Sequence, residues 1–108
     1  MIELLEKHRT PIDDLCEKAG VQRLEIFGSA ATGSFDPANS DIDFIVDFAD
    51  CSPGYARRFF ALEAALASLL GTEVDLLTER SIENPYFKAS VDESRVTIYE
   101  ARVRQTAA

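Results

Sequence analysis

The sequence predicts a small α/β domain in which helices pack against a short mixed β-sheet. Residues 21–27 and 41–48 have the apolar, alternating composition of strands and are separated by a glycine-containing turn. Residues 1–20 and 52–70 instead repeat apolar side chains at helical spacing. The two patterns alternate along the chain, which gives the order helix, strand, turn, strand, helix, strand, helix.

Length and composition indicate one globular domain. The chain has 108 residues, of which 46% are hydrophobic, and this is enough for one core but not for two. Its net charge is −8, which repels polynucleotides and anionic membranes, so direct binding to nucleic acid is not expected. A basic protein partner would suit this acidic surface, although solubility alone also explains it.

Cysteine usage and the N-terminal residues indicate a cytoplasmic protein. Cys16 and Cys51 lack the spacing of a redox motif, so we expect two reduced thiols. Glu3 and Glu6 interrupt the apolar residues at the start of the chain, which is not typical of a signal peptide. No apolar run reaches the length that spans a membrane.

The first helix is expected to have two pieces. Thr10 is the predicted N-cap of the main piece, and Pro11 suits its first turn and separates it from a short helical turn before it. Gly20 is the predicted end. The side chains that share one face of this helix are Ile12, Leu15, Cys16 and Ala19. His8 is the only histidine, and we expect it to be solvated or to cap a helix.

The strand over residues 41–48 carries two carboxylates on one face. Side chains alternate along a strand, so Asp41 and Asp43 point the same way, about 6.6–6.8 Å apart. Their repulsion is about 2–3 kcal/mol at an effective dielectric of about 20. A divalent cation would turn this repulsion into attraction. A solvated strand face would also explain the pair.

The second half of the chain predicts a helix, a strand and a last helix. Ser52-Pro53 is expected to cap a helix that ends at Gly71, and residues 73–78 form a strand. In this strand, Asp75 lies on the face opposite to that of Val74 and Leu76. The apolar stripe of the first of these helices is Tyr55, Phe59, Leu62, Leu66 and Leu69.

The last helix is expected to begin at Asn84-Pro85. One side of it carries Phe87, Val91, Ser94 and Ile98. The β-branched run at residues 96–98 weakens this prediction, because such residues are poor helix formers.

Three strands could bring Asp41, Asp43 and Asp75 onto one face, where they would suffice to hold two divalent ions. Gly28 would let the backbone pass close to phosphates, and Ser29 could offer them N–H and hydroxyl donors. If residues 30–32 begin a helical turn, their free N–H groups would also point at the anion.

Other motif readings fail at specific residues. Gly28 and Gly33 have the spacing of a Walker loop, but Ser34-Phe35 stands where Lys-Ser or Lys-Thr is required. The sequence contains no GxGxxG motif, and Asp41 and Asp43 lack the following residues of a calcium-binding EF-hand loop.

The combined pattern resembles the DNA polymerase beta-type nucleotidyltransferase superfamily. The signature consists of Gly28-Ser29, Gly33 and Ser40-Asp41-Ile42-Asp43 before an apolar strand. Asp75 sits where that superfamily carries its third carboxylate. The length of the chain and Asn84-Pro85-Tyr86-Phe87 resemble its minimal nucleotidyltransferase branch, as a single domain over residues 1–108.

The resemblance implies transfer of AMP from ATP to a hydroxyl, with two Mg²⁺ ions. Asp41 and Asp43 would bind both ions, and Asp75 would bind the catalytic ion and accept the proton of the nucleophile. The residues implied to contact the nucleotide are Gly28, Ser29, Thr32, Gly33 and Ser40. It also implies a partner, a small helical HEPN-domain toxin with ribonuclease activity, which this protein would neutralise as an antitoxin by adenylylating a tyrosine.

One departure from the superfamily leaves alternatives open. Many members have arginine before the second glycine, whereas this chain has Thr32, which predicts a weaker hold on the triphosphate. A first alternative is therefore a binding module that neutralises its partner by contact, with weak or no catalysis. A second is a nucleotidyltransferase acting on a small molecule, against which the absence of a second substrate domain argues. The base, the acceptor hydroxyl and homo-oligomer formation stay open.

Overall fold

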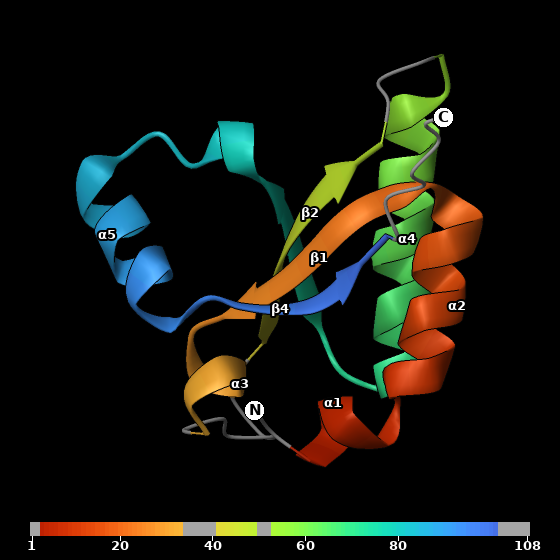
Figure 1. Cartoon of the computed structure of the whole chain (residues 1–108), viewed down its shortest axis with the longest axis horizontal. Coiled ribbons are helices and arrows are strands. Elements are labelled where there is room, and N and C mark those ends of the chain that lie inside the picture. Colours follow the sequence, from red (N-terminus) through yellow and green to blue (C-terminus); the bar gives the residue numbers. More distant parts are fainter. Residues whose placement is uncertain (1–2, 34–40, 50–52, 102–108) are drawn as a thin grey trace, which may run out of the picture.

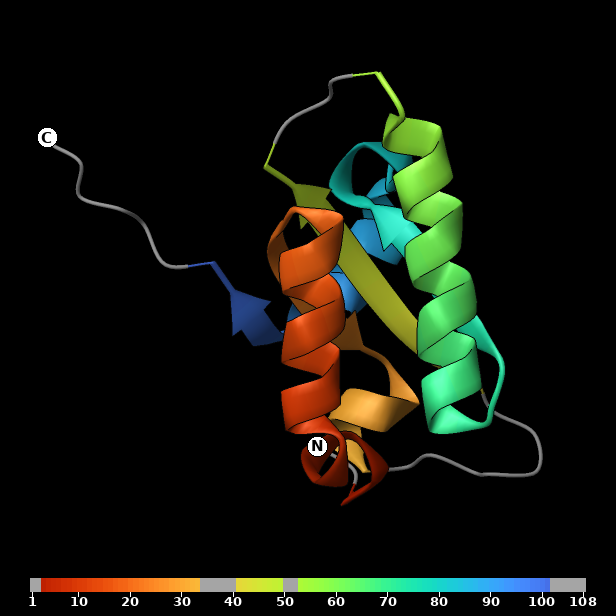
Figure 2. The ribbon, with the colours of Figure 1, turned by 90° about the vertical axis from the view of Figure 1, so that its right-hand side faces the viewer.

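The computed structural model describes residues 3–33, 41–49 and 53–101 of the chain. Helices α1 (Glu3–Lys7), α2 (Arg9–Ala19) and α4 (Tyr55–Leu70) lie on one face of a central sheet, and α5 (Pro85–Ser94) lies on the other. Figure 2 shows α2 and α4 side by side in front of the strands. This arrangement confirms the predicted α/β class.

The sheet has four strands in the order β3-β2-β1-β4. Strand β1 (Val21–Phe27) runs antiparallel to both β2 (Ile42–Phe48) and β4 (Val96–Glu100). Strand β3 (Val74–Thr78) runs parallel to β2, and α4 provides the crossover between them. The predicted mixed sheet is therefore confirmed, with one strand more than expected.

The additional strand replaces the end of the predicted last helix. Helix α5 ends at Ser94, and the β-branched run at residues 96–98 belongs to β4. Ile98 is buried in the sheet and does not lie on the helix. The prediction was wrong here because the free edge of β1 offered these strand-forming residues a partner, which the pattern of the segment alone does not reveal.

The start of α5 agrees with the sequence. The Asn84 side chain accepts hydrogen bonds from the amides of Tyr86 and Phe87, at 2.8 and 3.2 Å. Pro85 occupies the first turn, where a missing N–H leaves no hydrogen bond unmade.

The predicted starts of the two long helices α2 and α4 were misplaced. His8 occupies the N-cap position of α2, so Thr10 and Pro11 lie inside its first turn, where proline is tolerated. His8 makes no N-cap hydrogen bond, and its Nδ1 donates to the carbonyl of Leu4 at 2.8 Å instead. Helix α4 begins at Tyr55 after Gly54, whereas the predicted cap Ser52 lies outside the described residues.

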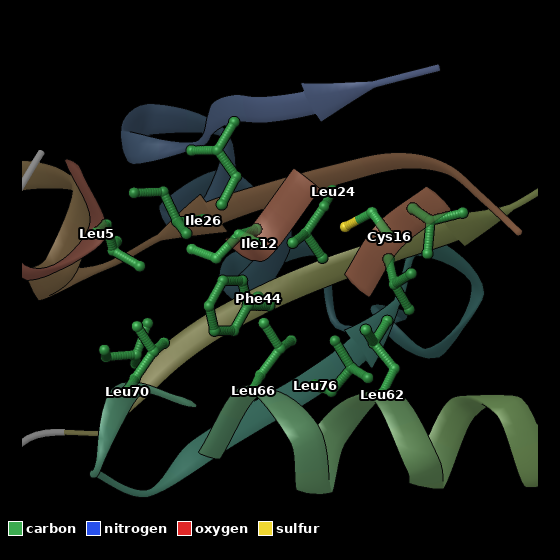
Figure 3. Close-up of a cluster of buried hydrophobic side chains, with 14 of the residues drawn as sticks. Leu5, Ile12, Cys16, Leu24, Ile26, Phe44, Leu62, Leu66, Leu70 and Leu76 are labelled. Atoms are coloured by element: carbon green, nitrogen blue, oxygen red, sulfur yellow. The ribbon is translucent and has the colours of Figure 1, made fainter. Parts of the chain in front are cut away.

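The main hydrophobic core fills the space between the sheet and the helices α2 and α4 (Figure 3). Leu62 and Leu66 of the predicted α4 stripe are buried, and Leu70 is buried where the stripe predicted Leu69. The remaining stripe residues pack at the edge of this core: Tyr55, Phe59 and Leu69. Within the described residues, no helix has the length and apolarity needed to cross a membrane.

Cys16 lies in this core as a free thiol. Burial, with a smaller contribution from the charge of Asp13, raises the pKa of Cys16 to about 12. The thiol therefore stays protonated and unreactive. The sequence predicted a reduced thiol here, and Cys16 is one. Cys51 lies outside the described residues.

A second, smaller cluster lies between the sheet and α5. It contains Phe27, Ile45, Ile82 and Val91, with Leu77 at its edge. The 3₁₀ helix η1 (Glu79–Ser81) leads from β3 toward α5. This cluster holds α5 over the sheet face on which the predicted carboxylates lie.

Candidate active site

Asp43 of β2 and Asp75 of β3 are direct register partners in the parallel ladder. Partners on adjacent strands point to the same face of the sheet. The neighbours of Asp43, Ile42 and Phe44, belong to the main core on the side of α2 and α4. Both carboxylates therefore lie on the face covered by α5.

Asp41 stands two residues before Asp43, just ahead of the first residue of β2. Asp41 and Asp75 are exposed, whereas Asp43 is half-buried. Burial, followed by the charges of Asp75 and then Asp41, raises the pKa of Asp43 to about 6. The charges of Asp75 and Asp41 thus act on Asp43, and ionised Asp43 lies in an unfavourable environment that a cation would relieve.

The three carboxylates are not close enough together in the structure to coordinate one metal ion as they stand. Across residues 3–33, 41–49 and 53–101, no three histidine, cysteine or acidic side chains are gathered closely enough to hold a metal ion. The donor chemistry nevertheless fits Mg²⁺, which prefers carboxylate oxygens. Because Asp41 and Asp75 are exposed, their side chains can rotate toward Asp43 without displacing packed neighbours.

The Gly28 turn lies directly against Asp43. Phe27, the last residue of β1, is paired in register with Asp43, and Gly28 follows it with a φ of 74°. A Cβ atom placed on Gly28 would be 3.0 Å from Oδ2 of Asp43. Glycine is therefore required here both by the positive φ and by the nearby carboxylate. The predicted close approach of Gly28 to phosphates stays a prediction.

Helix α3 (Ser29–Thr32) follows Gly28 as a single turn. The amides of Ala31 and Thr32 donate to the Gly28 carbonyl, at 3.0 and 3.1 Å. The expectation that the amides of this turn are free was therefore wrong for these two residues, because a carbonyl at the start of a helix accepts the first internal hydrogen bonds.

Of the other residues predicted to contact the nucleotide, one lies near Asp43, two lie farther away, and one is not described. Ser29 is half-buried beside Gly28, at the end of the sheet where Asp43 lies. Thr32 and Gly33 are exposed at the far end of the α3 turn. Ser40 lies outside the described residues.

Two residues of this region were not singled out as site residues from the sequence. The amide of Gly28 donates to Oγ of Ser94 at 2.8 Å. The helical spacing placed Ser94 on one side of the last helix with Phe87 and Val91, and in the structure this side of α5 faces the sheet. Its contact with Gly28 joins residues 66 positions apart, which no local pattern predicts.

Arg95, the next residue, forms a network of ion pairs on the same face of the sheet. Its guanidinium donates to Glu25 of β1, to Glu79 of η1 and to Asp92 of α5, at shortest distances of 2.7, 2.6 and 2.8 Å. The hydrogen bonds to Glu79 and Glu25 raise the pKa of Arg95 further. This network fastens the end of α5 to the sheet.

The sequence of this chain matches the model of a known protein family. The family model described as the nucleotidyltransferase domain matches residues 9–98. The chain belongs to this nucleotidyltransferase family. The match includes both strands that carry the carboxylates, the Gly28 turn and α5.

Known relatives agree with this assignment. The nucleotidyltransferase is 38% identical, over 96 residues, to a Methanocaldococcus jannaschii protein whose name proposes protein adenylyltransferase activity. The alignment covers 89% of this chain and 92% of that relative.

Two solved structures are also similar to the nucleotidyltransferase. The first is named as a proposed minimal nucleotidyltransferase; it has a TM-score of 0.69 at 30% identity and covers 88% of this chain and 95% of that one. The second is a chain of a toxin–antitoxin structure with AMP-PNP; it has a TM-score of 0.65 at 27% identity and covers 87% and 74%.

Proposed function

We propose that this nucleotidyltransferase is a single minimal domain that transfers AMP from ATP to a hydroxyl of a partner protein. The observation that carries the proposal is the placement of Asp43 in register with Asp75 and against the Cα atom of Gly28. The placement puts a pair of carboxylates beside a turn that is open to a close backbone approach. Such a combination suits a bound metal ion and a triphosphate.

Asp41, Asp43 and Asp75 would hold Mg²⁺ at the starts of β2 and β3. When bound, Mg²⁺ would neutralise charge on the triphosphate and make the attacking hydroxyl easier to ionise. Asp43 is the fixed member of this set, because it is half-buried and lies against the Gly28 turn. The exposed Asp41 and Asp75 would close on the ion by rotating their side chains.

The chemical step needs one proton acceptor and one leaving group. The hydroxyl oxygen of the acceptor attacks the α-phosphorus of ATP, the bond from that phosphorus to the β-phosphate oxygen breaks, and pyrophosphate leaves. Asp75 would take the hydroxyl proton, because it is exposed and therefore accessible to a side chain of another protein. The Gly28-Ser29 turn would hold the triphosphate during this step.

The proposed acceptor is a HEPN-domain toxin, with this protein acting as its antitoxin in the cytoplasm. Support comes from the similarity to a chain of the toxin–antitoxin structure with AMP-PNP, and from the name of the Methanocaldococcus relative. The net charge of −8 also suits a basic partner. Thr32 stands where many family members have arginine, so the partner would supply the missing positive charge.

The experiment is to incubate the protein with labelled ATP, Mg²⁺ and the HEPN protein encoded beside it, and to measure label on that protein. We expect transfer by the natural protein and none by Asp43→Asn. The matched control is Asp47→Asn, because Asp47 is an exposed carboxylate further along β2. Transfer by Asp43→Asn at the natural rate would show that the assignment of Asp43 is wrong.

A second candidate function is neutralisation of the partner by contact, without catalysis. The observation that favours it is that the three carboxylates are not gathered into a finished metal site. This function predicts a stable complex with the partner and no label on it. It also predicts that Asp43→Asn neutralises the toxin as well as the natural protein does.

A further inference from the structure

The Gly28 turn is held from two sides by hydrogen bonds. Its carbonyl accepts from the amides of Ala31 and Thr32, at 3.0 and 3.1 Å. Its amide donates to Ser94 Oγ at 2.8 Å. The hydrogen bonds to the carbonyl come from the turn itself. The hydrogen bond from the amide goes to α5, which is distant from the turn in the sequence.

The Ser94 contact acts on a backbone that has unusual freedom. Gly28 has φ 74° and ψ −148°, a combination of backbone angles that residues other than glycine rarely adopt. Glycine has no Cβ atom, so steric contacts do not favour this conformation over others. Hydrogen bonds must therefore select the orientation of its peptide groups. The Ser94 hydroxyl fixes the peptide group that joins Phe27 to Gly28.

Helix α5 is itself firmly anchored, so it can serve as a reference for the turn. Phe87 packs edge-on against Phe27, with ring centroids 6.0 Å apart, and Val91 is buried. One residue beyond Ser94, the Arg95 guanidinium donates to Glu25 at 2.7 Å. Ser94 therefore lies between two fixed points, and Figure 1 shows α5 on the sheet face away from α2 and α4.

We propose that Ser94 is a positioning residue for nucleotide binding, which holds the Gly28-Ser29 turn in the orientation that receives the triphosphate. This inference rests on the proposed function. Removal of the hydroxyl leaves the part-buried Gly28 amide without its partner, and the peptide group rotates to find another. Rotation moves Ser29 and its donors away from the position beside Asp43.

The test compares three variants by calorimetric titration with AMP-PNP in Mg²⁺. We expect Ser94→Ala to bind about 5- to 10-fold more weakly than the natural protein, the effect of one lost hydrogen bond. Ser94→Thr keeps a hydroxyl, so its affinity should stay within about 2-fold of the natural value. Ser90→Ala is the matched control, because Ser90 is exposed on the same helix, and it should leave affinity unchanged.

Steady-state transfer supplies the second readout. In Ser94→Ala the KM for ATP should rise by the same factor while kcat falls less, because the carboxylates are untouched. If Ser94→Ala binds AMP-PNP as tightly as the natural protein, or if Ser94→Thr binds as weakly as Ser94→Ala, the proposed role of Ser94 is wrong. Either result would leave the proposed function standing. Absence of AMP-PNP binding by the natural protein, both alone and in the presence of its partner, would instead overturn the proposed function, and the inference with it.

Discussion

The guanidinium of Arg95 holds the carboxylate of Glu25 through two hydrogen bonds, from Nη2 at 2.7 Å and from Nε at 3.2 Å. Glu25 is 8% exposed and lies within β1, where water cannot solvate its carboxylate freely. The pair connects the junction of α5 and β4 to the centre of the sheet. Together with the packing of Phe87 and Val91, it fixes where α5, and with it Ser94, meets the Gly28 turn.

Arg95→Ala should destabilise the fold by about 2–4 kcal/mol, because it leaves the Glu25 carboxylate largely buried without a counter-charge. Urea denaturation measures the free energy of unfolding. Arg23→Ala is the matched control, since the Arg23–Glu100 pair has side chains that are 46% and 54% exposed. Its loss should be below about 1 kcal/mol. Equal losses in the two variants would contradict the structural role of the Glu25 pair.

Asp43→Asn should make the metal-free protein more stable at pH 7, by about 1 kcal/mol after allowance for partial exposure of the group. The pKa of Asp43 is raised from 3.8 to about 6 in the folded protein, so its ionisation opposes folding as the pH rises through this interval. Below about pH 4 the carboxyl is protonated in both states, and the gain should vanish.

Urea denaturation in the presence of a chelator, at pH 3.5 and pH 7, measures this difference. Asp47→Asn serves as the control, because it removes an exposed carboxylate from the same strand. A metal-free Asp43→Asn protein that is less stable than the natural one at pH 7 would mean that Asp43 is structural.

Gly28→Ala should both destabilise the protein and weaken binding of AMP-PNP. Alanine at φ 74° is strained, by about 1–2 kcal/mol, and its Cβ would press on the Asp43 carboxylate at 3.0 Å. Gly54→Ala separates the two effects, because Gly54 has φ 96° and nothing within 4 Å of an added Cβ. Calorimetric titration should show weaker binding in Gly28→Ala only, and natural affinity there would remove the turn from the site.

Thr32→Arg should increase affinity for ATP by about 10-fold, because a guanidinium forms charge-assisted hydrogen bonds with phosphate. Thr32 is exposed at the end of α3, so the longer side chain can extend from the surface. Thr32→Gln has a long polar side chain without the charge and should change the affinity little. If both variants bind ATP like the natural protein, the triphosphate does not reach this position.

The sequence predicted those parts of the site that depend on local periodicity. The alternation of β2 and β3 was sufficient to place Asp43 and Asp75 on a common side, and the register of the two strands then brings them opposite one another. For Gly28 the sequence predicted a close approach to phosphates, and the structure shows a close approach to the Asp43 carboxylate, which local chemistry did not predict.

The features that were missed depend on tertiary contacts. The helical pattern placed Ser94 on the same side of the last helix as Phe87 and Val91, but which group that side meets depends on how α5 crosses the sheet. The segment at residues 96–98 formed a strand because β1 had a free edge, and Arg95 found Glu25 from 70 residues away. Interactions at such separations are set by topology rather than by neighbouring residues in the sequence.

The most direct measurement is the position at which a divalent cation binds, determined by NMR with Mn²⁺ and AMP-PNP. Mn²⁺ broadens the signals of nearby amides. We predict selective broadening of Asp41, Asp43, Asp75 and Gly28, and its loss in Asp43→Asn. Broadening centred instead on Asp47 and Glu79, which line a hollow at the other end of β2 and β3, would contradict the account.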